Sequence, residues 1–213
     1  MAKGKSRTQA RASSSASRPT ASAAQEVRII GGQWKRSKLD VPDRPGLRPT
    51  PSRVRETLFN WLGQDLSGWR CVDAFAGTGA LGLEAASRGS DAVELIEQDP
   101  ELVRGLRQAV ERLKASDRVS VKAGDGLSAL KAMPAGSVDL VFLDPPFGGD
   151  AGNDAVSLAA LAAARHAIHG EGWVYLEAPR AWSEPELADA GYALYRSGKA
   201  GQVAFHLLQC TSI

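Results

Sequence analysis

The tetrad Asp144-Pro145-Pro146-Phe147 is the most specific chemical feature of the sequence, and it directly follows an apolar run at residues 138–143. Consecutive prolines have fixed φ angles and no N–H donors, so they end a strand and keep the loop rigid. The Asp144 carboxylate and the Pro145 carbonyl then remain as acceptors for the N–H bonds of a base amino group, whose lone pair they can aim at a methyl group. Phe147 can stack the base once it has left its helix. The tetrad predicts methyl transfer to an exocyclic base nitrogen; the alternative is a structural turn with a buried Phe.

A glycine-rich loop with the sequence Asp-Ala-Phe-Ala-Gly-Thr-Gly-Ala-Leu-Gly spans residues 73–82. Glycines let such a loop turn tightly and approach a ligand closely, and the N-terminus of the following helix favours anionic groups. Glu97 follows Gly77 by twenty residues, a spacing that places a carboxylate beside the ribose of a nucleoside cofactor. The loop and this acid together predict a cofactor site.

The identity of the cofactor depends on Asp73. The pattern Gly77-x-Gly79-x-x-Gly82 matches the dinucleotide fingerprint, so an NAD-dependent oxidoreductase is an alternative. A carboxylate just before the loop would repel a pyrophosphate, but it suits S-adenosylmethionine, whose methionyl end carries an ammonium and a sulfonium group. Asp125 follows the third expected strand, where it can accept a hydrogen bond from an adenine amino group or cap the next helix, and the two roles can coexist.

These residues can form one site only if a β-sheet brings them together. The sequence predicts such a sheet from residue 70 onward. We expect strands at 71–75, 92–97, 119–122, 138–143 and 173–177, which alternate with helices at 80–87, 100–114, 126–133 and 155–167. This rhythm predicts an α/β fold with a parallel, doubly wound sheet, whose ligands bind outside the carboxyl ends of the strands. Two last strands at 192–197 and 203–209, joined by a turn at 198–201, predict an antiparallel hairpin. A parallel sheet with such a hairpin is typical of the Rossmann-like class I methyltransferases.

The chain divides into three regions. Residues 1–25 are rich in Ser, Ala and Arg and predict a disordered basic tail that adds non-specific affinity for RNA. Residues 26–50 predict a small hairpin and a Pro-rich loop, and residues 51–213 the methyltransferase domain. Thr50 and Pro51 predict an N-cap and the first residue of a helix. Its buried stripe contains Val54, and we expect the flanking Arg53 and Arg55 to point elsewhere, toward a polar partner.

Charge is distributed unevenly along the chain. Residues 1–25 carry five basic and no acidic residues, whereas residues 71–213 carry twelve basic and nineteen acidic residues. A basic N-terminal region joined to an acidic C-terminal region suggests that the protein binds a polyanion through its N-terminal region. No apolar run is long enough for a membrane span, and Cys71 and Cys210 have no metal-type spacing. We expect a cytoplasmic protein that needs no metal.

Taken together, these motifs resemble a known family, the bacterial 16S rRNA (guanine-966-N2)-methyltransferases, over residues 27 to about 209. The segments that carry the resemblance are Arg28-Ile-Ile-Gly-Gly-Gln-Trp-Lys, Gly46-Leu-Arg-Pro-Thr, Arg53-Val-Arg-Glu-Thr-Leu-Phe-Asn-Trp-Leu, the glycine loop, Leu95-Ile-Glu, the tetrad, and Gly201-Gln-Val-Ala. The tetrad and the loop occur in many amino-methyltransferases, whereas the first three segments are narrower and indicate the subfamily. Ser52 departs from the pattern, since an acidic residue is expected there, and the tail is longer than the family needs.

The resemblance implies a class I fold with a small N-terminal hairpin, catalysis at the tetrad, and 16S rRNA in an assembled or partly assembled 30S subunit as the partner. It implies S-adenosylmethionine contacts at Ala76, Gly77, Gly79, Glu97 and Asp125, to which we add the nearby Asp73, Thr78, Gln98 and Gly126. The basic residues that we expect to contact RNA are Arg28, Lys35, Arg36, Lys38, Arg48, Arg53 and Arg55. We expect the enzyme to act as a monomer.

Three other functions share part of this pattern. A DNA adenine-N6 methyltransferase uses the same tetrad but needs a sizeable target-recognition region, for which the chain has no room. A methyltransferase that acts on protein glutamine normally carries Asn where Asp144 stands. A catalytically inactive RNA-binding module would not need Asp144, Glu97 and the glycine loop together. Methylation of another exocyclic base amine, such as adenine N6, stays the alternative.

Overall fold

The computed structural model describes the whole chain except residues 2–26, 43, 45–46, 48, 147–152 and 212–213. The expected basic tail, the RNA-contact candidate Arg48 and the tetrad residue Phe147 therefore lie outside the described residues. Among the residues that are described, no helix is long and apolar enough to cross a membrane.

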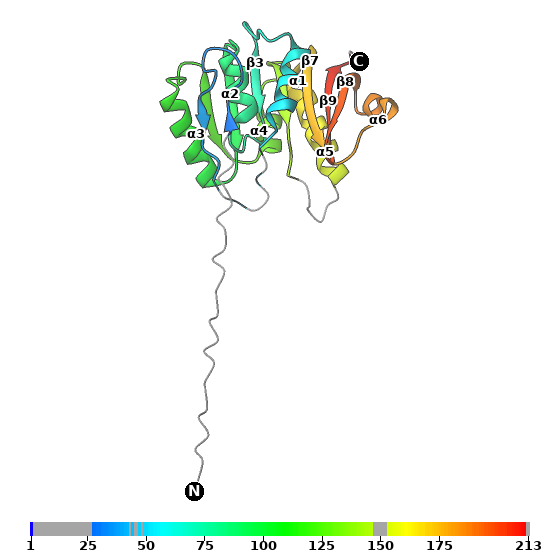
Figure 1. The fold of residues 1–213 in the computed structure, drawn as a ribbon. Coiled ribbons are helices and arrows are strands. Elements are labelled where there is room, and N and C mark those ends of the chain that lie inside the picture. The colour runs from blue at the N-terminus through cyan, green and yellow to red at the C-terminus, as the bar shows by residue number, and fades with distance from the viewer. Residues whose placement is uncertain (2–26, 43, 45–46, 48, 147–152, 212–213) are drawn as a thin grey trace.

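The centre of the protein is a seven-stranded sheet with the order β5-β4-β3-β6-β7-β9-β8. Its strands are β3 (Arg70–Asp73), β4 (Ala92–Glu97), β5 (Val119–Ala123), β6 (Val138–Leu143), β7 (Ile168–Ala178), β8 (Tyr192–Ala200) and β9 (Val203–Cys210). The first five are parallel, and β9 runs antiparallel between β7 and β8. This order confirms the expected parallel sheet that ends in an antiparallel hairpin (Figure 1).

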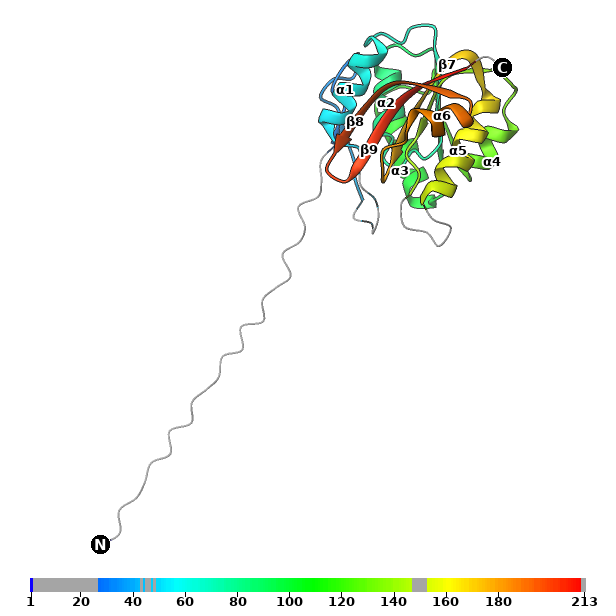
Figure 2. The same cartoon turned by 90° about the vertical axis from the view of Figure 1, so that its right-hand side faces the viewer.

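Helices cover both faces of the sheet, as Figure 2 shows from its β8 edge. They are α1 (Ser52–Leu62), α2 (Ala80–Ser87), α3 (Pro100–Arg112), α4 (Gly126–Ala132), α5 (Asn153–Ala167) and α6 (Glu184–Asp189). The first three pack on one face and the last three on the other, which gives two separate apolar cores. Burial on both sides explains why β6 reads as an almost continuous apolar run.

The helix boundaries follow local capping chemistry. The Asp99 side chain accepts hydrogen bonds from the Glu101 and Leu102 N–H groups, and Pro100 stands in the first turn of α3. Asp125 caps α4 by accepting from the Ser128 N–H, which is one of its two expected roles. Each cap satisfies N–H groups that a helix leaves without internal partners.

Several boundaries differ from the sequence expectation; β7, for example, begins at Ile168 rather than at residue 173. The turn of the last hairpin does not begin at Gly198, because β8 continues to Ala200. Gly198 stays in the strand because the ring of Phe205 packs where a Cβ would be, only 2.3 Å away. The expected cap at Thr50 is also wrong: α1 begins at Ser52, and Pro51 occupies the N-cap position with no side-chain hydrogen bond.

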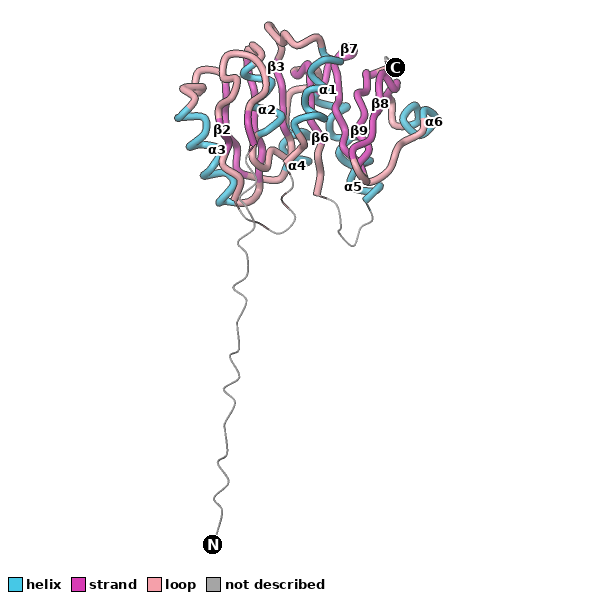
Figure 3. The backbone as a smooth tube through the Cα atoms, viewed as in Figure 1, coloured by secondary structure: helices cyan, strands magenta, loops and turns pink. Residues whose placement is uncertain are grey.

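The expected N-terminal hairpin is present as β1 (Val27–Arg28) and β2 (Lys38–Leu39), which pair antiparallel. It is tied to α2 because the Ser87 hydroxyl donates to the Gly31 carbonyl at 2.6 Å and accepts from the Trp34 N–H at 2.9 Å. Figure 3 shows β2 close to α3, and the Arg112 side chain of α3 donates to the Lys38 carbonyl at 2.8 Å. Farther along the chain, Leu47 and Pro49 line the cavity described below. The hairpin therefore rests on the same core as α1 to α3.

Candidate active site

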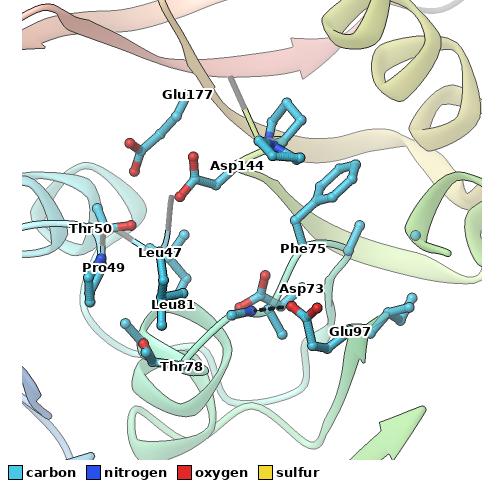
Figure 4. A pocket seen from close by; sticks show the side chains of 18 of the residues that line it. Leu47, Pro49, Thr50, Asp73, Phe75, Thr78, Leu81, Glu97, Asp144 and Glu177 are labelled. Carbon is cyan, nitrogen blue, oxygen red and sulfur yellow. Dashed lines mark hydrogen bonds between the residues drawn. The ribbon is translucent and has the colours of Figure 1, made fainter. Parts of the chain in front are cut away.

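A cavity of about 1010 Å³ opens at the carboxyl ends of β3, β4, β6 and β7. Its walls come from the glycine loop, the residues after β4, β5 and β6, the segment before α1, and the β8–β9 hairpin. Figure 4 shows Asp73 and Glu97 near the glycine loop, and Asp144 and Glu177 together on another wall. Such a volume exceeds that of most single-ligand pockets, so a cofactor and a base can occupy it together.

The glycine loop is held in place by Glu97 at the end of β4. One oxygen of this carboxylate accepts from the Gly77 N–H at 2.9 Å, and the other accepts from the Asp99 N–H at 2.8 Å. Gly77 has a φ of 53°, which favours a residue without a side chain. Each oxygen keeps a second lone pair, so the carboxylate can still accept from ribose hydroxyls.

Asp73 lies beneath the loop at the end of β3 and is almost fully buried. Its Oδ2 accepts from the Gly82 N–H at 2.9 Å, whereas its Oδ1 has no hydrogen-bond partner among the described residues. A buried, unpartnered carboxylate oxygen costs free energy unless a ligand satisfies it. Its position fits the ammonium group of a methionyl ligand.

Asp144 and Glu177 occupy neighbouring places on parallel strands. Phe142 of β6 pairs with Tyr175 of β7, and Leu143 pairs with Leu176, so the next step along each strand brings the two acids together. Side chains alternate along a strand, which puts both carboxyl groups on the face that carries Phe142 and Tyr175. Asp144 is partly exposed to the cavity, while Glu177 is only 6% exposed.

The Glu177 carboxyl group lies between two hydroxyl-bearing residues. The Tyr175 hydroxyl donates to its Oε1 at 2.8 Å. The buried Thr50 lines the same cavity, and its side chain stabilises the charged form of Glu177. The segment before α1 therefore forms part of the cavity wall beside Glu177.

The crowding of these acids changes their protonation. Burial raises the pKa of Asp73 to about 7, with the Gly82 N–H opposing the rise and the charge of Glu97 adding to it. Burial, and then the charges of Glu177 and Asp73, raise the pKa of Asp144 well above its ordinary value. Burial also raises the pKa of Glu177, although hydrogen bonds from Tyr175 and Thr50 oppose it.

The raised pKa of Asp73 affects stability in a defined direction. In an unfolded chain an Asp titrates near pH 4, so between about pH 4 and 7 the folded protein holds a proton on Asp73 that the unfolded chain has lost. The stability contributed by protonated Asp73 is fully present below about pH 4 and is lost as the pH rises through about 7; the raised pKa values of Asp144 and Glu177 act in the same direction. A cation bound in the cavity would offset this loss.

The structure gathers most of the expected site residues. Those that line the cavity are Asp73, Ala76, Gly77, Thr78, Glu97, Gln98, Asp125, Gly126, Asp144, Pro145 and Pro146. Gly79 is not among the lining residues; it is the N-cap residue of α2, with a φ of 78°, and packs against Leu106 and Leu83. Their roles in catalysis and cofactor binding remain predictions.

The basic residues expected to contact RNA have different surroundings. Arg28, Lys35, Arg36, Lys38 and Arg53 are exposed. Arg55 is only 2% exposed, so the expectations that it avoids the buried side of the helix and contacts RNA are wrong, whereas the polar partner expected for it is present. Its guanidinium donates to Glu84 at 3.2 Å and to the Arg28 carbonyl at 2.9 Å, so it holds the hairpin to α1 and α2.

Glu177, Thr50 and Glu84 are site or supporting residues that the sequence reasoning missed. Glu177 ends a strand next to the tetrad strand, and ligands bind at such strand ends, so its position was a usable signal. Glu84 is the only charged residue of an otherwise small and apolar helix, and such a buried charge requires a partner. Nothing near Thr50 in the sequence indicates its contact with Glu177.

Comparison with known proteins now adds to this geometry. The family described as Conserved hypothetical protein 95 matches residues 27–209. Ribosomal RNA small subunit methyltransferase D of Escherichia coli K12 is 40% identical over 199 residues, covering 90% of this chain and 94% of that protein. The protein of the same name from Haemophilus influenzae is 36% identical and covers 89% and 97%. The chain belongs to this methyltransferase family. The family match covers the N-terminal hairpin as well as the sheet, so it includes the residues that line the cavity.

Solved structures agree with this family. The Escherichia coli protein yhhF is 39% identical and covers 89% of this chain and 100% of that chain, with a TM-score of 0.72. A methyltransferase from Geobacter sulfurreducens, at 16% identity and a TM-score of 0.59, shares the fold alone. The fold is thus that of a class I methyltransferase. Such an enzyme takes the methyl group that it transfers from a donor cofactor.

Proposed function

We propose that the chain transfers a methyl group from S-adenosylmethionine to the exocyclic N2 of one guanine in 16S rRNA. The observation that carries this proposal is the shared cavity, which is lined by Asp144 and the Pro145-Pro146 pair as well as by the acids Asp73 and Glu97. The relatives named for ribosomal RNA of the small subunit support the substrate. Nothing in the cavity favours adenine N6, the alternative target.

The residues present fit S-adenosylmethionine. The unpartnered Oδ1 of Asp73 suits the ammonium group, Glu97 suits the ribose hydroxyls, and Asp125 suits the adenine amino group. When bound, this cofactor supplies an electrophilic methyl group on a sulfonium. The described part of the cavity wall holds two buried acids, Asp73 and Glu177, and no buried cation, which makes a cationic ligand favourable there.

The protein's own residues prepare the base. The Asp144 carboxylate and the Pro145 carbonyl accept the two N–H bonds of the amino group, which turns the nitrogen lone pair toward the methyl group. The amine proton becomes acidic once the methyl group is attached, and the ionised Asp144 carboxylate accepts it. The buried floor of the cavity excludes water from this step.

The substrate reaches the cavity as part of a large polyanion. We assign the RNA contacts to the exposed residues Arg28, Lys35, Arg36, Lys38 and Arg53, together with Arg48, and a salt-dependent share of the affinity to residues 1–25. The partner is an assembled or partly assembled 30S subunit, which places the enzyme in the cytoplasm. It acts as a monomer on this substrate.

Cofactor affinity should depend on pH through Asp73. Below pH 7 this acid holds a proton in the free protein, and that proton must leave before the carboxylate can bind an ammonium. We expect the dissociation constant of S-adenosylmethionine to rise by up to about tenfold for each pH unit below 7. Isothermal titration calorimetry at pH 6 and pH 8, in two buffers of different ionisation enthalpy, measures both the affinity and the released proton.

The matched variants for this test are Asp73→Asn and Asp117→Asn. Asp73→Asn should bind weakly at pH 8 and lose most of the pH dependence, leaving a smaller part from Asp144 and Glu177. Asp117 is exposed and far from the cavity, so its variant should behave as the wild type. An unchanged affinity of the wild type between pH 6 and pH 8 would show that Asp73 does not meet the cation.

The experiment that tests the function is methyl transfer from labelled S-adenosylmethionine to 30S subunits that lack the modification. The labelled nucleoside is then identified by mass spectrometry. We expect N2-methylguanosine from a single site of 16S rRNA. Label on adenine, on protein or nowhere would contradict the proposal.

A further inference from the structure

Glu177 lines the cavity, but the proposed mechanism of methyl transfer gives this residue no role. It lies beside Asp144 at the end of the next strand, lines the same cavity, and is held by Tyr175 and Thr50. No arginine, lysine or histidine side chain pairs with it among the described residues. A nearly buried carboxyl group with only two hydroxyl donors still has acceptor capacity directed into the cavity.

The chemistry of the expected substrate supplies matching donors. Guanine presents three N–H bonds along one edge, two on its N2 amino group and one on N1. Adenine presents an amino group beside N1, which carries no hydrogen and is an acceptor. The Asp-Pro-Pro part of the tetrad grips only an amino group, so it does not by itself distinguish these two bases.

We propose that Glu177 is the residue that selects guanine, by accepting a hydrogen bond from N1–H while Asp144 and Pro145 hold the N2 amino group. This inference rests on the proposed function. Parallel strands lie about 4.8 Å apart, and this spacing lets two side-by-side carboxyl groups meet two adjacent nitrogens of one base. An adenine in the same place would set its N1 lone pair against the Glu177 carboxylate and leave that group without its bond.

The surroundings of Glu177 suit a flat base. Phe205 of β9 is the direct antiparallel partner of Glu177, so both side chains lie on the same face of the sheet. Phe205 also lines the cavity and is stacked on Trp61, with ring centroids 5.4 Å apart. The acid and an aromatic ring thus stand side by side on the wall that a flipped base would meet.

The test compares guanine with 2-aminopurine, which keeps the N2 amino group but has an acceptor at N1. The substrates are 30S subunits reconstituted with 16S RNA that carries either base at the methylated position. For the wild type, we expect kcat/KM for guanine to exceed that for 2-aminopurine by about 100-fold. For Glu177→Gln, whose amide can donate to N1, we expect this ratio to fall to within about threefold of unity.

Glu171→Gln is the matched control, since Glu171 lies at the other end of the same strand and is exposed. It should keep the wild-type ratio. A ratio that is unchanged in Glu177→Gln would overturn the inference while leaving the proposed function intact. Absence of methylated guanine with the wild type would remove both.

A second measurement does not depend on how the variant folds. Equal kcat/KM of the wild type for guanine and 2-aminopurine would by itself contradict recognition of N1–H. A merely structural role of Glu177 would lower both rates together, so the ratio separates that role from base selection.

Discussion

We expect Asp144→Ala to lower kcat for methyl transfer by about 1000-fold, while the affinity for S-adenosylmethionine stays nearly unchanged. In the proposed mechanism the carboxylate accepts an N–H bond of the base amino group, and this interaction strengthens as the nitrogen becomes positively charged during transfer. An alanine leaves the amine with its lone pair delocalised into the ring. Single-turnover assays with labelled cofactor and 30S subunits measure the rate, and calorimetry measures cofactor binding.

The variant should fold, because Asp144 stands among acids. Burial and the charges of Glu177 and Asp73 raise its pKa, so its removal relieves repulsion in the free protein. Asp139→Ala is the control, since Asp139 lies on β6, the strand that Asp144 follows, and is not among the residues that line the cavity. Its methyl transfer rate should stay close to that of the wild type. Equal loss of cofactor binding and catalysis in Asp144→Ala would contradict the assigned role.

The sequence predicts those site residues that lie at the carboxyl ends of parallel strands. Asp73, Glu97 and Asp144 each follow a short apolar run, and parallel strands bring their carboxyl ends to one edge of a sheet. Knowing the rhythm of strands and helices was therefore enough to place these acids in one cavity. The fold class follows from the same rhythm and from the final hairpin.

The residues that the sequence did not predict depend on contacts between distant segments. Thr50 lies near Glu177 only because the segment before α1 and the end of β7 line the same cavity. Arg55 was expected on the surface because it follows a buried residue in a helix. It is buried instead, since the N-terminal hairpin covers that side of α1, and no local pattern in α1 contains this information.

Glu84 is the centre of the contacts that hold this hairpin, and its replacement should have a large effect on stability. Its carboxylate accepts from the Ile30 and Gly31 N–H groups at 2.8 and 2.7 Å, and it pairs with Arg55 and Arg88 at 3.2 and 2.9 Å. All three charged side chains are nearly inaccessible to solvent. Burial lowers the pKa of Arg55 and the charge of Glu84 opposes this, so the network depends on the acid.

We expect Glu84→Ala to lower the free energy of unfolding by about 3–5 kcal/mol, because two buried guanidinium groups lose their counterion. Chemical denaturation of the free protein at 25 °C measures the change. Glu101→Ala is the control: Glu101 pairs with Arg44 at the surface, and such pairs contribute about 0–1 kcal/mol. A loss in Glu84→Ala no larger than in Glu101→Ala would show that the network does not stabilise the fold.

The same variant separates the hairpin from the cofactor cavity. Glu84 does not line that cavity, and the Asp73 and Glu97 contacts do not involve it. At a temperature where Glu84→Ala is still folded, we therefore expect affinity for 30S subunits to fall more than affinity for S-adenosylmethionine. The reason is that Glu84 fixes the backbone at Ile30 and Gly31, and so the position of the exposed basic residues to which we assign the RNA contacts. An equal loss of both affinities would mean that Glu84 supports the whole domain rather than the placement of the hairpin.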